Sequence, residues 1–316
     1  MHDILADFLR TLQLQSCIYC QSEIHKGDWA LRFHAFNGGM FHIVREGCCW
    51  LLCGEQKLKV EVGELVILSQ GTEHIIADRV DAPLCADIYP PHDSAEQCQR
   101  MRWGSDDVHT VLICGTFHFH NFRGASLLPV LPPIIHFRAE HVQQHGLAPI
   151  ITALIEEANT ERQGKNVVLH RLADILFVQA IRACMADPTT QAQGWLAGLR
   201  DPQIAAALAE IHSDPARNWT VERLATRAAM SRSAFAARFT ELIGISPIEY
   251  LTNWRMQLAI RLLDHFHLSI EEIAGRVGYS SEIAFGRAFK RVFFISPSAY
   301  RRDMQALPHK LADEHL

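Results

Sequence analysis

Histidines able to bind a metal ion are spread over the first 120 residues of the chain. The candidate ligands are His34, His42, His74, His118 and His120. Neutral imidazole is a good ligand for zinc and other divalent ions, so these side chains predict a metal site if they converge inside a barrel. His118 and His120 would share one face of a strand, because side chains two residues apart do so. The competing interpretation is that these histidines pack in the core or face solvent, since their spacing is not that of a structural zinc site.

Thiols are a second source of chemistry. The chain has nine cysteines, an odd number with uneven spacing, which favours reduced thiols over a disulfide framework. A redox sensor needs an accessible thiol with a low pKa. The candidates for that role are Cys17, Cys20, Cys48, Cys49, Cys53 and Cys85. Cys49 and Cys114 lie in strand-like runs, so we expect both of them in the core.

Short strands between Trp29 and about Phe122 must position these side chains. Apolar or alternating runs are separated there by turn residues. The predicted strands are 31–34, 40–44, 49–52, 57–62, 65–68, 111–114 and 116–120. Several strands at short, regular spacing are typical of an antiparallel sandwich or barrel.

Helical patterns flank this β-rich segment. Apolar residues recur at helical spacing in the first 12 residues, and two longer helices are predicted at about 148–160 and 167–186. The second of these has Leu169, Leu172, Ala173, Leu176 and Ala180 on one stripe. Residues 187–194 contain Asp-Pro-Thr-Thr and a glycine, which indicates a linker. Beyond Asp201 the periodicity is helical throughout.

A repeat of about 50 residues occupies the C-terminal part. Thr220 and Ser269 each begin a short helix as hydroxyl N-caps, and each is followed by an acidic residue, Glu222 or Glu271, that favours the positive helix end. A second helix follows in each copy. We expect its caps to be Ser231 and Ser280, with one extra residue in the second copy.

Each second helix carries two phenylalanines one turn apart on its buried face, Phe235 and Phe239 in the first copy and Phe285 and Phe289 in the second. Two capped helices joined by a tight turn form a helix-turn-helix. The segment from Ile248 to Leu263 is continuous in helical period and would be a spacer about 24 Å long. Two recognition helices could then enter successive major grooves, about 34 Å apart on one face of DNA.

Three short motifs stand out in the second copy of the repeat: Gly278-Tyr-Ser-Ser-Glu282, Phe285-x-Arg287-x-Phe289-Lys-Arg291 and Ser296-Pro-Ser-Ala-Tyr-Arg301. They match the signature of the second helix-turn-helix in the AraC/XylS family of bacterial regulators, which the C-terminal sequence therefore resembles. The resemblance covers about Gln203–Arg302. It implies a DNA-binding region made of two helix-turn-helix units joined by a long helix.

The resemblance also implies which residues face DNA. In the first recognition helix these are Ser233, Ala236 and Ala237, beside Arg232, and in the second they are Ser281, Glu282, Ile283, Ala284 and Arg287. Arg287 can bond guanine through two N–H groups, and Glu282 can accept from cytosine. Arg232, Lys290 and Arg291 are better placed for phosphates. The two alanines suggest contacts with thymine methyl groups or weak readout. The competing interpretation is that all of these are ordinary solvated helix faces.

One residue departs from the family pattern. Phe294 stands where the first copy has Gly244 and where the family usually has glycine. That position often needs a positive φ, so Phe294 implies either strain or a different local turn.

The β-rich segment contains Gly63-Glu64 followed by Gly71-Thr-Glu-His74. This spacing is similar to the second half of a cupin signature, so the N-terminal sequence resembles a cupin sensor domain. Phe41–Gly47 and Cys114-Gly115 resemble the cupin halves of one branch of AraC-type regulators, which includes members that respond to reactive chlorine species. The resemblance covers about Asp3–Phe122. The first cupin motif, His-x-His…Glu, is missing, which puts a complete metal site in doubt.

Charge is distributed unevenly along the chain. The net charge is −5, but Arg200–Arg302 has 14 basic and 10 acidic residues, a local net of +4, and the remainder carries −9. Phosphate attraction depends on the local field, so the C-terminal part can bind DNA. No run of about 18 apolar residues is present, and the start lacks the profile of a secretory signal. We therefore expect no membrane segment and a cytoplasmic location.

These features predict an α+β multidomain protein with a cupin-like antiparallel β-barrel, a helical connector and an all-α tandem helix-turn-helix domain. The expected regions are a sensor at 1–145, a helical dimerisation or linker region at 146–190, a DNA-binding domain at 191–305 and a tail at 306–316. The helical pair would form the dimer contact or relay the signal, or would only pack against the barrel.

The predicted function is sequence-specific transcription regulation, tuned by a small molecule, a metal or an oxidant. The expected partners are double-stranded DNA, RNA polymerase (as for an activator) and a second copy of the chain. The sequence identifies no cofactor with certainty, and a divalent metal such as zinc in the cupin-like domain is the candidate. The alternative is a cupin-type metalloenzyme, such as a dioxygenase or isomerase, with an accessory helical domain. It needs a complete metal site and leaves the repeat unexplained. An architectural DNA protein without a sensor would leave the β-rich segment unexplained.

Overall fold

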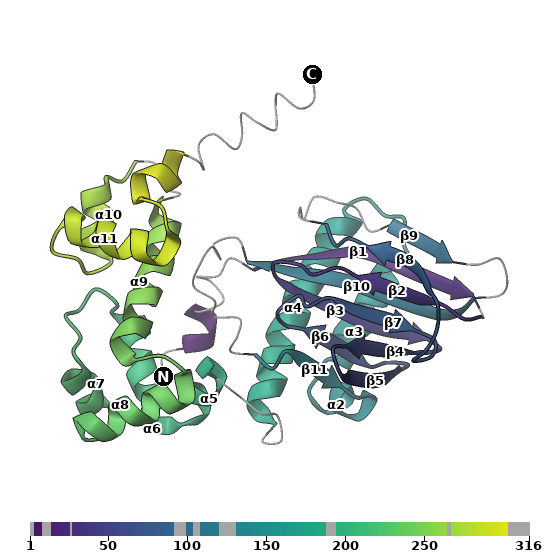
Figure 1. Ribbon diagram of the computed structural model, residues 1–316, viewed down its shortest axis with the longest axis horizontal. Coiled ribbons are helices and arrows are strands. Elements are labelled where there is room, and N and C mark those ends of the chain that lie inside the picture. Colours follow the sequence, from purple (N-terminus) through teal and green to yellow (C-terminus); the bar gives the residue numbers. More distant parts are fainter. Residues whose placement is uncertain are drawn as a thin grey trace. The chain divides into compact units, whose positions relative to one another are not determined.

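A computed structural model describes residues 3–7, 14–25, 27–91, 99–103, 108–119, 131–187, 194–263 and 267–302. The described chain divides into two compact units, a β-rich unit within residues 14–187 and a helical unit within residues 194–302 (Figure 1). The predicted α+β architecture is confirmed. None of the described helices combines the length and the apolar character needed to cross a membrane.

Two sheets form the β-rich unit. The first has the strand order β11 (Ile134–Phe137), β6 (Leu65–Leu68), β3 (Gly39–Glu46), β10 (Val108–Phe119), β1 (Leu14–His25) and β9 (Gln99–Trp103). The second has the order β5 (Gln56–Glu61), β4 (Cys48–Cys53), β7 (His74–Ala77), β2 (Ala30–Phe33) and β8 (Leu84–Ile88). Apolar side chains from both sheets form one core, which includes Leu31, Phe33, Met40, Val66 and Leu112.

This arrangement differs from the predicted antiparallel barrel in two ways. The described strands form two separate sheets and do not close into a single one. In addition, β9 pairs with β1 and β8 pairs with β2 in parallel, at one edge of each sheet. The other described pairs are antiparallel, so the cupin-like character of the unit holds.

Strand β1 was not predicted from the sequence. It pairs with β10 over most of its length, and Cys20 lies opposite Cys114. Side chains on both of its faces are buried, because the second sheet covers one face and helices cover the other. The alternation of apolar and polar residues that reveals a half-buried strand is therefore absent.

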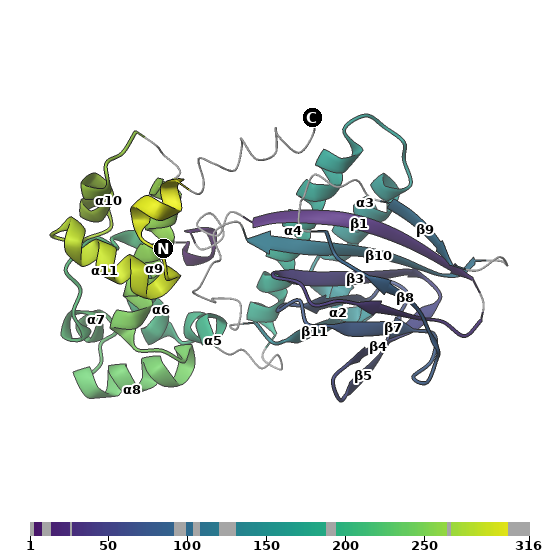
Figure 2. The same ribbon diagram turned by 45° about the horizontal axis from the view of Figure 1, so that its top comes forward.

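Three helices complete the β-rich unit, α2 (Ala139–Gln144), α3 (Ala148–Ala158) and α4 (Lys165–Ala186). Figure 1 and Figure 2 show α4 lying against the first sheet and α3 packed beside α4. Polar contacts join them to β1: the Ser16 amide donates to Asp174 Oδ1 at 3.1 Å, and Gln21 Nε2 donates to Asn159 Oδ1 at 3.4 Å. Of the predicted apolar stripe on α4, Leu172 is half-buried and the other four members are buried.

The helical unit contains α5 (Gly194–Arg200), α6 (Pro202–Ser213), α7 (Val221–Arg227), α8 (Arg232–Ile243), α9 (Pro247–Leu263), α10 (Ile270–Arg276) and α11 (Glu282–Phe293). Residues 297–302 are also helical. Figure 1 shows α9 running between the α7–α8 pair and the α10–α11 pair. The spacer helix predicted from Ile248 to Leu263 is thus α9, which begins one residue earlier.

Phe294 ends α11 in a left-handed conformation with φ 63°. Gly244 ends α8 in the same way with φ 87°, so the two copies use the same turn. Of the two possibilities that the sequence left open, strain is therefore the one observed, because a residue with a Cβ is disfavoured in this region. The Phe294 side chain is 79% exposed and contributes little burial in return.

Replacing Phe294 by glycine should raise the free energy of unfolding of the helical unit by about 0.5–1 kcal/mol, because glycine adopts a positive φ without steric cost. Urea unfolding followed by circular dichroism measures the change. The reverse exchange, Gly244→Phe, is the matched control and should destabilise the unit by a similar amount. A lower unfolding midpoint for Phe294→Gly would show that the aromatic ring stabilises this turn.

Candidate DNA-binding surface and sensor core

The first helix of each repeat begins at the predicted hydroxyl cap. Thr220 Oγ1 accepts from the Arg223 amide at 3.3 Å, and Ser269 Oγ accepts from the Glu272 amide at 3.0 Å. In the second repeat, Glu272 Oε2 also accepts from the Ser269 amide at 2.7 Å, which completes a capping box. Glu271 was the acidic residue expected to matter at this helix start, whereas Glu272, three residues after the cap, is at the position typical of such a box.

The second helix of each repeat begins at a serine as well, but one of the two predicted caps is wrong. Ser231 caps α8, whereas Ser281, not Ser280, caps α11. The Ala234 amide donates to Ser231 Oγ at 3.3 Å, and the Ala284 amide donates to Ser281 Oγ at 3.2 Å. The extra residue of the second repeat therefore lies in the turn before the cap and leaves both recognition helices in the same register.

The phenylalanine pairs hold both recognition helices against the core. Phe235, Phe239, Phe285 and Phe289 are fully buried. Phe239 meets Tyr250 edge-on with 5.7 Å between ring centroids, and Phe289 meets Tyr300 in the same way at 6.0 Å. The same packing at both sites makes the two repeats one structural motif used twice.

The positions predicted to face DNA lie on the opposite side of each helix. In α8, Ala236 is half-buried, and the other predicted residues, Arg232, Ser233 and Ala237, are exposed. The exposed set around α11 is Ser281, Glu282, Ile283, Ala284, Arg287, Lys290 and Arg291. Ile283 is 69% exposed, which is unusual for an isoleucine in a folded unit and suits an apolar contact with a base.

Cations on the two recognition helices differ in their surroundings. Arg232 Nε lies 2.8 Å from Glu222 Oε1, and Arg238 Nη2 lies 3.0 Å from Asp201 Oδ2. On α11, Arg287 and Lys290 form no ion pair with any residue that the structure describes. The second recognition helix therefore presents its positive charge with less local compensation than the first.

Inside the β-rich unit, His42 and His74 form a hydrogen-bonded chain with a thiol. His74 Nδ1 lies 2.8 Å from the Thr72 carbonyl oxygen, which only accepts, so Nδ1 carries the proton. His74 Nε2 must then accept from His42 Nε2 at 2.8 Å. The remaining nitrogen, His42 Nδ1, accepts from the Cys114 thiol at 3.1 Å. All four groups are satisfied with both imidazoles neutral.

This chain links the two sheets, because His42 is on β3 and His74 is on β7. Both histidines are only 2% exposed, and the Phe33 ring stacks on His74 at 5.1 Å. Burial, with His74 beside it, holds the pKa of His42 well below its usual range. Burial also lowers the pKa of His74 to about 4, against the opposing effect of the Thr72 carbonyl. Both side chains are therefore neutral near pH 7.

Only part of the predicted metal-ligand set comes together. His34 lies apart from the pair, with its ring nitrogens 2.9 Å from Asp87 Oδ1 and 3.3 Å from Glu73 Oε2. The side chain of His118 and the whole of His120 lie outside the described residues. Within the described part of the chain, no three His, Cys, Asp or Glu side chains gather as metal ligands. The residues described here do not fit the three or four ligands of a cupin metal centre.

The redox candidates differ in accessibility. Cys17 and Cys20 are fully buried, Cys48 and Cys53 are half-buried, and Cys85 is exposed. Cys49 and Cys114 are in the core, as expected from their strand positions. Burial raises the pKa of the Cys49 thiol far above its usual value, with smaller contributions from Cys48 and Glu64. Of these candidates, Cys85 has the accessibility that a redox sensor needs.

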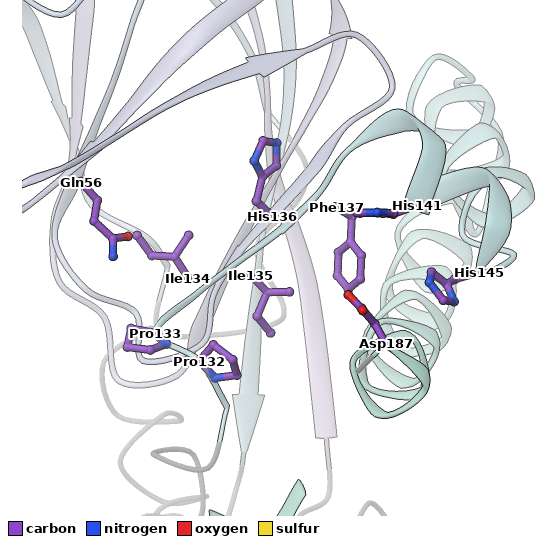
Figure 3. Close-up of a pocket in the computed structure, with 10 residues that line it drawn as sticks. All are labelled: Gln56, Pro132, Pro133, Ile134, Ile135, His136, Phe137, His141, His145 and Asp187. Carbon is purple, nitrogen blue, oxygen red and sulfur yellow. The ribbon is translucent and has the colours of Figure 1, made fainter. Parts of the chain in front are cut away.

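A pocket of about 400 Å³ lies between β11, α2 and the end of α4 (Figure 3). Its apolar wall consists of residues 132–135 and Phe137. Its polar lining includes Gln56, His136, His141, His145 and Asp187. His136 Nε2 is 2.8 Å from Glu64 Oε2, which fixes one side of the pocket. The volume is within the range of small-molecule sites, but more of the lining is polar than is usual for them.

Two capped helix-turn-helix repeats joined to a cupin-like β unit define a DNA-binding protein with a second, cupin-like domain. A cupin family model matches residues 3–186, and a helix-turn-helix domain model matches residues 224–303. A putative AraC-like transcription regulator of Streptomyces lividans is 36% identical over 303 residues, covering 95% of this chain and 98% of the relative. The chain belongs to the AraC family of transcription regulators.

Two other relatives align with this chain over most of their length. The transcriptional regulator AlkR of Acinetobacter baylyi is 30% identical over 285 residues, covering 88% of this chain and 92% of the relative. The RCS-specific transcriptional activator RclR of Escherichia coli is 28% identical over 283 residues, covering 89% of this chain and 90% of the relative. The DNA-binding domain of AdpA, solved with a target DNA, is 39% identical and covers 34% of this chain and 95% of that domain, with a TM-score of 0.32. The protein is a DNA-binding transcription regulator with a cupin-like N-terminal domain.

The free energy of unfolding should fall as the pH drops from about 6.5 toward 4. The folded-state pKa values of His42 and His74 lie below the unfolded value, so the unfolded chain binds more protons in this range. For His74 alone the loss between pH 7.5 and pH 5 is about 2 kcal/mol. Denaturant unfolding at the two pH values, followed by tryptophan fluorescence, measures it.

A matched pair of variants separates this pH effect from that of other groups. His74→Gln should flatten the pH dependence, whatever its effect on stability at pH 7.5. His109→Gln changes an exposed histidine on β10 and should leave the dependence as it is. Equal slopes for the wild type and His74→Gln would show that these buried imidazoles do not govern the acid response.

Proposed function

We propose that the protein regulates transcription by inserting α8 and α11 into successive major grooves of a promoter or operator. The contact residues are Arg232, Ser233, Ala236 and Ala237 of α8, and Ser281, Glu282, Ile283, Ala284, Arg287, Lys290 and Arg291 at α11. One observation carries this proposal. In both α8 and α11, one face is buried through a pair of phenylalanines and the opposite face is exposed. Selection of bound sites from random genomic fragments tests it. Enrichment of a motif with two half-sites is the expected result.

We assign recognition of the base sequence and electrostatic attraction to the phosphates to different residues of α11. Arg287 lies near the middle of the helix, has two N–H groups suited to guanine and is not engaged by an acidic neighbour within the described chain. Lys290 and Arg291 lie one turn further along, where phosphate contact is favoured. In α8, the two alanines leave room for thymine methyl groups.

Arg287→Ala should cost about 1–3 kcal/mol of binding at one base position and relax the base preference there. Lys290→Ala should weaken binding to all sequences almost equally and reduce the salt dependence by about one phosphate contact. Competition binding over a set of singly substituted operators, at several salt concentrations, distinguishes the two effects. If both variants bind as the wild type does, the assignment of α11 to the groove is wrong.

The β-rich unit is proposed to sense a signal that tunes DNA binding. A small molecule is supported by the pocket near α2, which lies beside Asp187 at the end of α4 (Figure 3). An oxidant is supported by exposed Cys85 and by the printed name of the relative RclR. A metal such as zinc has the least support, because the ring nitrogens of His42 and His74 are engaged by each other, by the Thr72 carbonyl and by the Cys114 thiol. DNA footprints made with and without hypochlorite, and with and without zinc, distinguish an oxidant from a metal as the signal.

The remaining roles follow from membership of a family of regulators. We propose that the protein is not an enzyme, since relatives that match over nearly their whole length are named as transcription regulators. Its place of action is the cytoplasm, where bacterial promoter DNA lies. Contact with RNA polymerase is proposed as the means of regulation. The division into regions 1–145, 146–190, 191–305 and 306–316 remains a prediction.

A homodimer is proposed to form through α4. One face of this helix packs on the first sheet, but its outer face carries Val168, Leu172, Ile175, Gln179 and Arg182 at alternating spacings of four and three residues. This is the spacing of a helix–helix contact. Val168 is 43% exposed and Ile175 is 48% exposed, so apolar area remains available on this face.

Ile175→Glu should weaken the dimer by about 10- to 100-fold in Kd, because pairing would bury a carboxylate from each copy. Sedimentation equilibrium over a range of concentrations measures the shift from dimer to monomer. Thr152→Glu adds the same charge to the exposed face of the neighbouring helix α3 and should leave the mass unchanged. A dimer of unchanged stability in Ile175→Glu would place the contact elsewhere.

A further inference from the structure

Arg255 lies in the middle of α9 and holds a turn of the first half of the helical unit. Its Nε donates to the Pro215 carbonyl oxygen at 2.7 Å, and its Nη2 donates to the Arg217 carbonyl oxygen at 2.9 Å. Both acceptors belong to the turn between α6 and α7. Hydrogen bonds from a charged donor are stronger than neutral ones, and the planar guanidinium fixes their direction as well as their length.

The turn that Arg255 holds is itself ordered. Trp219 Nε1 donates to the Asp214 carbonyl oxygen at 2.8 Å, and the Arg217 guanidinium lies 4.8 Å from the centre of the Trp219 ring. The Arg217 amide also donates to the Asp214 carbonyl oxygen at 3.3 Å. The carbonyl groups that receive Arg255 are therefore fixed points of the first repeat, close to the start of α7.

The same guanidinium contacts the second repeat. It lies 5.6 Å from the centre of the Tyr279 ring, within the range of a cation–π interaction. Tyr279 is in the turn between α10 and α11 and also shares a hydrogen bond with Thr252 on α9. One side chain thus joins the α6–α7 turn to the turn that precedes the second recognition helix.

Direct contact between the two turns occurs at Gly278. Its φ is +87°, and a Cβ there would lie 2.6 Å from the Ala216 carbonyl oxygen and 2.7 Å from Ala216 Cα. The same Cβ would lie 2.8 Å from Arg255 Nη2. Only glycine allows this approach without displacing backbone. The two repeats therefore touch through backbone atoms, with Arg255 closing the contact from α9.

We propose that Arg255 is a positioning residue that sets the separation and relative rotation of α8 and α11, and so determines which half-site spacing the protein accepts. This inference rests on the proposed function, in which both helices enter DNA. One base pair added between half-sites moves the second by about 3.4 Å along the duplex and rotates it by about one-tenth of a turn. A rigid pair of helices cannot follow that movement, whereas a loosened pair can.

The test uses the full chain and a DNA duplex enriched from random genomic fragments. Binding is measured for this duplex, for versions with one base pair inserted or deleted between the half-sites, and for a single half-site. For the wild type we expect a spacing change to reduce affinity by about 10-fold or more, the scale of losing one good base contact. In Arg255→Met the loss of affinity caused by a spacing change should shrink to within about 3-fold. The affinity of this variant for a single half-site should change only by the amount expected for one lost positive charge.

Two further variants keep the result interpretable. Arg276→Met removes an exposed positive charge on α10 and should retain the wild-type spacing penalty, which separates charge from position. Gly278→Ala pushes the two turns apart with no change in charge and should relax the penalty as Arg255→Met does. Circular dichroism shows that each variant is folded.

The outcomes separate this inference from the proposed function. A wild-type penalty that both Arg255→Met and Gly278→Ala retain would overturn the positioning role alone. A wild type that binds all spacings equally would overturn insertion of two helices into DNA, and the inference with it. The inference is supported if Arg255→Met and Gly278→Ala both tolerate the altered spacings while Arg276→Met loses affinity for them as the wild type does.

Discussion

Burial of two phenylalanines one turn apart is the constraint on which the DNA-binding unit depends. In α8 and α11 alike, this pair is fully removed from solvent and meets a tyrosine edge-on. An α-helix has 3.6 residues per turn, so fixing these two positions also fixes which residues lie on the far side. The face available to DNA is a consequence of the core. The side chains on it can vary without disturbing the fold, which suits a family that reads many different sites.

The β-rich unit uses a cupin signature for a different purpose. His74 occupies the histidine position of the signature, yet its nitrogens are engaged by the Thr72 carbonyl and by His42. The hydrogen bond between the imidazoles ties one sheet to the other in a region where the neighbours are mostly apolar. Buried polar groups are costly when unpaired, so this fully paired chain specifies how the two sheets align. A position that binds metal in enzymes of this fold here supports the architecture.

Local signals in the sequence predicted the helical unit well, because its elements depend on nearby residues. The caps at Thr220, Ser231 and Ser269, the phenylalanine pairs and the extent of α9 all follow from spacing along the chain. Ser281 was not predicted as the N-cap of α11, because the second repeat has one extra residue in the turn. Either of the adjacent serines, Ser280 or Ser281, could therefore be aligned with the cap of the first repeat.

Features that depend on distant residues were not predictable in this way. Strand β1 lacks alternation because helices cover its outer face, and the parallel edge strands β8 and β9 are set by tertiary pairing. The ion pair of Arg232 with Glu222 and the contacts of Arg255 join residues that only the folded turn brings together. His42 and His74 were predicted only as two of five candidate metal ligands, and neither the hydrogen bond between them nor its continuation to the Cys114 thiol was foreseen.

The pairing of β1 with β10 has a consequence for synthesis of the protein. Strand β1 can pair with its neighbours β9 and β10 only when Gln99–Trp103 and Val108–Phe119 have left the ribosome, and helix α4 follows later still. Until then the β-rich unit exposes apolar strand surface on both sides, the state in which nascent chains aggregate and recruit chaperones. Within each helix-turn-helix repeat the packing is mainly between helices that are adjacent in the chain, so we expect each repeat to fold faster than the β-rich unit.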